Sequence, residues 1–162
     1  ITLMTAPGDR SWTHMVEHVG TTITLEAWDT KYKPNQDWNH AWGAAPANIL
    51  PRKLMGIEPL APGWTKLQVC PRLGGLKWAE VRTPTPWGPV FTRAEAGPTF
   101  QLTVEIPAKT TAIILIPARD IDSVTESGKP LAQGKAKPLR LVGDRAMVEV
   151  SPGRYHFAAK TQ

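Results

Sequence analysis

Two carboxylates three positions apart, Glu26 and Asp29, lie in a short stretch that is rich in aromatic rings. The stretch runs from Gly20 to Arg52 and holds three of the seven tryptophans: Trp28, Trp38 and Trp42. Carboxylates among indole rings suit sugars, because the rings stack on the apolar C–H faces of a pyranose and the carboxylates accept hydrogen bonds from its hydroxyls. A dry aromatic wall also raises the pKa of a carboxyl group beside it, so that it can act as acid or base near neutral pH.

A simpler interpretation of the same residues stays open. Glu26 and Asp29 could be solvated loop residues, with the tryptophans in a core, and composition alone favours this. Thr21, Thr22 and Thr24 are poor helix formers behind Gly20, so we expect an extended or looped segment here. Loops held by a rigid scaffold are where binding residues concentrate.

The order of residues in this stretch resembles that of a known family. TTITLEAWD, followed by DWNHAWGAAPANILPRKLMGIEPLAPGW, is similar to the C-terminal portion of bacterial α-L-rhamnosidases. The residues that carry the resemblance are Thr21, Thr22, Leu25, Glu26, Trp28, Asp29, Asn39, His40, Gly43, Gly56, Ile57, Pro62 and Gly63. The chain departs from the family at Leu25, where many members have Trp, and at Pro46 and Pro51, in a helix that usually lacks proline.

The resemblance implies an inverting glycoside hydrolase with an (α/α)6 barrel followed by a C-terminal β-sandwich. It implies that Glu26 is the general base. The implied substrate-binding residues are Trp28, Asp29, Asn39, His40 and Trp42. The family's general acid lies in an earlier barrel segment, and none of these 162 residues matches it.

The resemblance also bears on partners and location. It implies a rhamnose-containing glycan or glycoside as ligand, the remainder of a parent catalytic chain as partner, and no cofactor or metal. It favours a periplasmic or extracellular location in a bacterium. His14 and His18 have the i, i+4 spacing of metal ligands, but no third ligand is evident nearby and paired exposed histidines are commoner than metal sites.

Two helices precede the predicted sandwich and are expected to position the aromatic stretch. Residues 11–19 predict the first, with Trp12, Met15, Val16 and Val19 on one apolar face. The second is expected from about residue 41 to 55 and is kinked, or begins, at Pro46. We therefore expect residues 1–57 to be the terminal helices and active-site loop of an incomplete barrel, and residues 58–162 to be the sandwich domain.

From Trp64 onward the hydrophobic period becomes two. Residues 100–106 alternate apolar and polar, residues 112–116 form a continuous apolar run, and residues 146–150 alternate again. Ser151-Pro152-Gly153 predicts a hairpin turn to a strand that carries Tyr155 and Phe157. With weaker strands between them, these segments predict a mainly β chain, an antiparallel sandwich of about eight strands.

Length and composition narrow the function further. At 162 residues and 41% apolar, the chain can bury one good core. The net charge of +5 comes from Lys and Arg spread along the sequence rather than clustered, which argues against nucleic-acid binding. Without an apolar run of 18 residues we expect no membrane span, and the single Cys70 is expected to be a small buried hydrophobe. The sequence begins with the mostly apolar residues Ile-Thr-Leu-Met and has no initiator Met, so we expect it to be a piece of a longer protein.

Two classes of function follow. In the first, the chain is the C-terminal part of an α-L-rhamnosidase and contributes to its active site, but is inactive alone. In the second, it is a non-catalytic β-sandwich module with a carbohydrate-binding or structural role. Pyranose binding by residues outside 20–43 would favour the second.

Overall fold

The computed structural model describes residues 1–160. The chain forms two compact units, Ile1–Ile49 and Leu50–Gln162. The predicted domain boundary after residue 57 lies beyond this division and stays a prediction.

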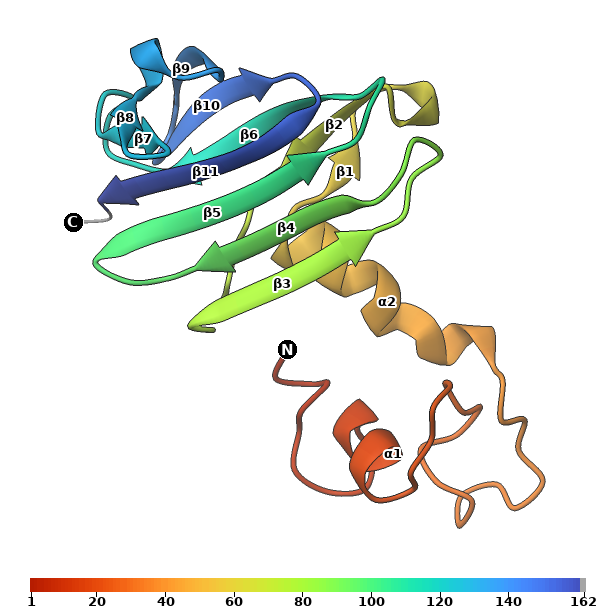
Figure 1. Cartoon of the computed structure of the whole chain (residues 1–162). Helices are drawn as coiled ribbons and strands as arrows, with labels where there is room; N and C mark the ends of the chain where they lie inside the picture. The colour runs from red at the N-terminus through yellow and green to blue at the C-terminus, as the bar shows by residue number, and fades with distance from the viewer. Residues whose placement is uncertain (161–162) are drawn as a thin grey trace. The chain divides into compact units, whose positions relative to one another are not determined.

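The second unit is a sandwich of two sheets, which Figure 1 shows stacked face to face. The first sheet has the order β1 (Glu58–Pro59), β2 (Lys66–Val69), β6 (Thr111–Pro117), β10 (Arg145–Val150) and β9 (Lys137–Val142). The second has the order β3 (Trp78–Thr83), β4 (Val90–Glu95), β5 (Thr99–Ile106), β11 (Gly153–Lys160), β7 (Val124–Glu126) and β8 (Lys129–Pro130). Two short 3₁₀ turns, η3 (Pro62–Trp64) and η4 (Leu131–Gln133), lie between strands. Eight of the strands in the described residues have four residues or more, and the predicted mainly β sandwich is confirmed.

The core lies between the two sheets. In β5 every second residue, from Phe100 to Ile106, is buried and the residues between them are more exposed, as the alternation predicts. β6 is buried on both faces, since Ala112, Ile114 and Ile116 face the main core while Ile113 and Leu115 pack with Cys70. The expectation that Cys70 is a small buried hydrophobe is confirmed.

Two details of the predicted sandwich are wrong. β2 and β6 pair in parallel, whereas the other strand pairs are antiparallel. The turn Ser151-Pro152-Gly153 does not close a hairpin, because β10 belongs to the first sheet and β11 to the second. The Tyr155 hydroxyl donates to the Ser151 carbonyl oxygen at 3.1 Å across this corner. Alternation alone describes one strand at a time, so it could not separate a hairpin from a change of sheet.

No strand is predicted at β9, since the weaker strands are expected at residues 67–69, 78–82, 89–93 and 121–125. Strand β9 is the edge of the first sheet, and all six of its residues are exposed, so it shows no alternation between a buried and a solvated face. Trp87, in the turn before β4, is tied to a second loop because its indole N–H donates to the Gly63 carbonyl oxygen at 2.8 Å.

The helices are shorter and less regular than predicted. Helix α1 spans Trp12–Glu17. Residues 41–54 form one helical run in three parts: the 3₁₀ turn η1 (Ala41–Ala44), the α-helix α2 (Ala45–Ile49) and the π-helical turn η2 (Leu50–Leu54). Pro51 has no N–H to donate to the preceding turn, and the next backbone bonds have the wider π spacing, with Met55 N donating to Leu50 O at 3.1 Å. Of the helices in the described part of the chain, none has the length and apolar character that a membrane crossing requires.

Candidate active site

Helix α1 lies beside the loop that carries Glu26. Its N-cap is Ser11, whose hydroxyl oxygen accepts a hydrogen bond from the His14 backbone N–H at 3.2 Å. Met15 on this helix is buried, but Val16 is 62% exposed, so the predicted apolar face is only partly covered. After Gly20 the chain turns back, and the Thr21 N–H donates to the Met15 carbonyl oxygen at 3.0 Å.

The segment around Glu26 is held by the segment around Asp37. The Glu26 N–H donates to the Asp37 carbonyl oxygen at 3.0 Å, and the Ala27 N–H donates to Gln36 Oε1 at 2.9 Å. The bonds arise because two extended stretches meet across the turn that contains Lys31 and Lys33. The backbone at Glu26 is therefore held by bonds that do not involve its carboxylate.

Both carboxylate oxygens of Glu26 are engaged within this loop. Oε1 forms an ion pair with the Lys33 ammonium, and Oε2 accepts from the Asp37 N–H at 3.2 Å. These two contacts, Lys33 first, lower the pKa of Glu26 below its ordinary value. The expectation that an aromatic wall raises this pKa is wrong, because a cation and a backbone donor outweigh the loss of hydration.

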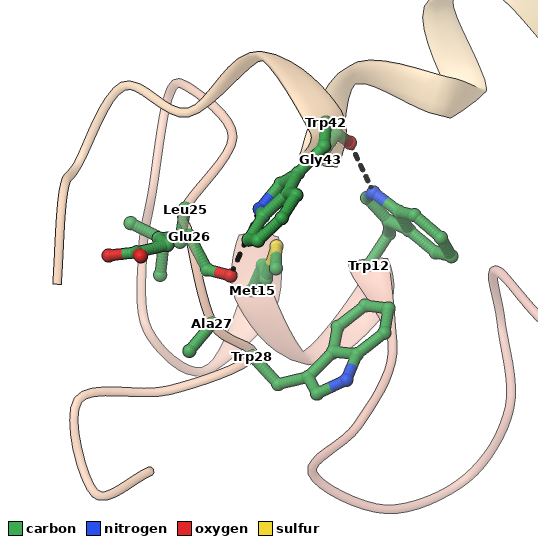
Figure 2. A pocket seen from close by; sticks show the side chains of 8 residues that line it. All are labelled: Trp12, Met15, Leu25, Glu26, Ala27, Trp28, Trp42 and Gly43. Atoms are coloured by element: carbon green, nitrogen blue, oxygen red, sulfur yellow. Dashed lines mark hydrogen bonds between the residues drawn. The ribbon is translucent and has the colours of Figure 1, made fainter. Parts of the chain in front are cut away.

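Three indole rings surround a cavity of about 260 Å³ beside Glu26. Its lining residues, drawn in Figure 2, are Trp12, Met15, Leu25, Glu26, Ala27, Trp28, Trp42 and Gly43. The rings of Trp12 and Trp28 meet edge to face with centroids 4.8 Å apart. Two hydrogen bonds fix the other walls: Trp12 Nε1 donates to Gly43 O at 2.7 Å, and Trp42 Nε1 donates to Glu26 O at 3.3 Å.

Figure 2 also shows which part of Glu26 faces this cavity. The backbone carbonyl of Glu26 points to the Trp42 ring, whereas its carboxylate is turned away from Trp12 and Trp28. The carboxylate thus lies at the margin of the aromatic cavity, on the side of Lys33.

Asp29 is bonded to helix α1 and to its own turn. Its Oδ2 lies 2.7 Å from His14 Nε2, and its Oδ1 accepts from the Lys31 N–H at 3.1 Å and from the Thr30 hydroxyl at 3.3 Å. The bond to His14 is the largest cause of a lowered pKa for Asp29. His14 thereby ties the loop to α1. In the described chain no group of three or more His, Cys, Asp or Glu side chains is placed to hold a metal ion.

Asn39 and His40 come directly before η1, and His40 has an extended backbone as the N-cap of that turn. The His40 N–H donates to Thr24 O at 2.9 Å, and the Thr24 hydroxyl donates to His40 O at 2.8 Å. The His40 ring lies 4.4 Å from the Trp42 ring, and its Nδ1 is buried without a hydrogen-bond partner among the described residues. Asn39 is exposed.

Of the six predicted site residues, Glu26, Trp28 and Trp42 line the aromatic cavity, while Asp29, Asn39 and His40 do not. The sequence predicts Trp12 on the apolar face of a helix and indicates no role for Lys33. In the sequence, the spacing of Trp12 from Val16 is the same whether the indole ring packs in a core or lines a cavity. The spacing between Lys33 and Glu26 likewise does not indicate that the two side chains form an ion pair.

Two family models match adjoining parts of the chain. Residues 1–54 match the family model of the bacterial α-L-rhamnosidase six-hairpin glycosidase domain, and residues 56–130 match that of the bacterial α-L-rhamnosidase C-terminal domain. The chain belongs to the bacterial α-L-rhamnosidase family. It corresponds to the end of the six-hairpin domain and the C-terminal domain of that family.

Individual relatives agree with this assignment. An α-L-rhamnosidase of Formosa agariphila is 28% identical over 161 residues, covering 93% of this chain and 17% of the relative. The structure of Streptomyces avermitilis α-L-rhamnosidase complexed with L-rhamnose is similar with a TM-score of 0.75 at 26% identity, over 98% of this chain and 16% of that one. The α-L-rhamnosidase of Dictyoglumus thermophilum shares the fold, with a TM-score of 0.75 at 22% identity, over 97% of this chain and 18% of that one. The chain therefore spans about one sixth of the length of these relatives.

Proposed function

We propose that this chain forms the C-terminal part of an α-L-rhamnosidase and supplies one side of its active site. The intact enzyme would hydrolyse terminal α-L-rhamnosyl residues with inversion at the anomeric carbon. One observation carries the proposal: an ionised carboxylate, Glu26, stands beside a cavity walled by indole rings, within the residues that match the six-hairpin glycosidase domain.

Glu26 is proposed as the general base that takes a proton from the attacking water. Glu26 is ionised at neutral pH, which a base requires, although the lowered pKa makes it a weaker base than a free carboxylate. A carboxylate has about four lone-pair positions, and the contacts with Lys33 and Asp37 occupy one on each oxygen, so each oxygen keeps one for water. The proposed general acid comes from another segment of the parent chain, with its carboxyl about 6.5–9.5 Å from Glu26 to admit the water.

The neighbouring residues are proposed to hold the sugar. Trp28 and Trp42 offer indole faces to the apolar side of a pyranose. The unpaired Nδ1 of His40 is a candidate partner for a sugar hydroxyl, and exposed Asn39 offers an amide. Asp29 was predicted to accept a hydroxyl, and its bonds to His14 and to the Lys31 N–H mean that it can do so only with its remaining lone pairs.

The first test uses the chain alone. Without a general acid it should show no turnover of an aryl α-L-rhamnoside above the uncatalysed rate. Intact enzymes typically turn over at about 1–10³ per second, and a rate in that range would refute the proposal that the acid lies elsewhere.

The second test uses the parent enzyme that the proposal implies. Glu26→Gln keeps the size and hydrogen-bonding reach of the side chain but cannot accept the proton, so kcat should fall about 10²–10⁴-fold with little change in KM. With the wild-type parent enzyme, proton NMR should show that the rhamnose is first released as the β anomer. The matched control is Asp29→Asn, which should act mainly on KM. Near-normal kcat in Glu26→Gln together with loss of kcat in Asp29→Asn would mean that the base is Asp29.

A further inference from the structure

A second cavity, polar rather than aromatic, lies in the sandwich unit between two neighbouring segments of chain. Residues 54–58 and 68–72 run side by side there, with the Cys70 N–H donating to Met55 O at 3.1 Å and the Arg72 N–H to Leu54 O at 2.7 Å. The approach depends on Gly56, which has a φ of 64°, since a Cβ there would lie 2.3 Å from the Cys70 carbonyl oxygen.

The cavity has a volume of about 230 Å³ and is dominated by positive charge. Three of its lining side chains are cations: Arg52, Lys53 and Arg72. One is a carboxylate, Glu58, which lies 3.0 Å from Lys53 Nζ and 3.7 Å from Arg52 Nε. These cations, Lys53 first, lower the pKa of Glu58, so the carboxylate is ionised at neutral pH and neutralises only one of the three positive charges.

Arg72 is the cation without a carboxylate of its own. Glu58 serves Lys53 and Arg52, and among the described residues no carboxylate forms an ion pair with Arg72. Gln68, which pairs with Glu58 in the β1–β2 register, adds an amide to the same lining. An Arg fork, an ammonium and an amide N–H₂ are donors that suit a planar or tetrahedral oxyanion.

We propose that this cavity binds a small oxyanion through Arg72, Lys53 and Gln68. Its volume is below the roughly 300–1,000 Å³ of pockets for drug-sized ligands, so it fits a single phosphate, sulfate or carboxylate group. The group is either a free inorganic ion or a substituent on a sugar. The cavity lies wholly in the sandwich unit, so the inference does not depend on the proposed function of Glu26.

The test is a titration of the whole chain with inorganic phosphate at constant ionic strength, with chloride as the exchanged anion. Amide shifts in ¹H–¹⁵N NMR spectra should saturate at Gly56, Gln68 and Arg72. Arg72→Gln should weaken the apparent Kd at least tenfold. The matched control is Arg154→Gln, which removes the same charge from an exposed pair with Glu105 outside the cavity and should leave the Kd unchanged.

A second variant is expected to bind phosphate more tightly, so its effect cannot be explained by loss of folding. Glu58→Gln removes the carboxylate that competes for Lys53, so it should tighten phosphate binding. Linear, non-saturating shifts, or equal weakening in Arg72→Gln and Arg154→Gln, would show only general screening of a chain with net charge +5 and would overturn the proposal. Weaker binding in Glu58→Gln would overturn it too.

Glucose 6-phosphate is the second probe and separates the two sources of the anion. Saturable binding of this ester, with the same loss in Arg72→Gln, identifies a group carried on a sugar. No binding of the ester beside saturable binding of inorganic phosphate identifies the free ion.

Discussion

A substitution at Leu25, the residue before Glu26, should unfold the first unit (Ile1–Ile49) and leave the sandwich unit folded. Its side chain is 1% exposed, and among the described residues of the first unit the other buried apolar side chain is Met15. Replacing a fully buried Leu by Ala typically costs about 2–5 kcal/mol. At about 0.05–0.15 kcal/mol per residue, a unit of about 50 residues has a stability of only about 2.5–7.5 kcal/mol. Leu25→Ala should therefore remove a large part of this stability.

The matched control is Ile114→Ala in the centre of the sandwich. Ile114 is 0% exposed, and its loss costs a similar amount. The sandwich unit has about 110 residues and, on the same scale, about 5.5–16 kcal/mol. That unit should stay folded in Ile114→Ala, with a lower denaturant midpoint.

Hydrogen exchange of individual amides distinguishes the two outcomes. In Leu25→Ala, amides of residues 12–43 should exchange near the unfolded rate, while those of β5 and β6 keep wild-type protection. Wild-type protection of residues 12–43 in Leu25→Ala would refute the argument that so small a core holds the Glu26 loop. Equal losses in both units would refute their independence.

Three further outcomes are expected. Lys33→Gln should raise the pKa of Glu26, because the ammonium is the main cause of its depression; the ¹³C shift of the carboxyl group against pH measures it, and an unmoved midpoint would contradict the ion pair. Asp9 has a pKa of about 2, below its ordinary 3.8. Its contribution to the stability of the folded state is therefore present above about pH 4 and is lost as the pH falls toward 2. Circular dichroism and hydrogen exchange should show the first unit loosening over that pH range, and a flat profile would contradict the role of Asp9. Gly56→Ala should lower the free energy of unfolding by more than the roughly 1–3 kcal/mol of a strained φ, because the added Cβ also meets backbone atoms. Gly128→Ala is the control, since it has a strained φ with open space around the Cβ. Equal urea midpoints in the two variants would disprove the close approach at Gly56.

The sandwich strands were predictable where one face is buried. In β5 the side chains alternate between core and solvent, so the alternation from Phe100 to Ile106 is visible in the sequence. Strand β9 has no buried face and left no such pattern. The pairing partner of each strand is not visible in the sequence, because strand pairing joins residues that lie far apart along the chain. The stacking of the sheets decides that β10 and β11 belong to different sheets and that β2 pairs in parallel with β6.

For the candidate site, the sequence by itself determined the family resemblance and the residue types. The order of Thr21, Thr22, Glu26, Trp28 and Asp29 carried the family resemblance, and residue types alone made a sugar plausible. Family membership depends on this local order, which survives in the linear sequence.

The electrostatic state of Glu26 was decided only by the tertiary structure. Lys33 meets its carboxylate because the loop turns back at residues 33–37, and this reversed the expected direction of the pKa shift. His14 meets Asp29 across fifteen residues for a similar reason, because α1 lies beside the loop. Charge interactions fall off over a few ångströms, so they depend on where folding places each side chain, and spacing in the sequence does not carry that information.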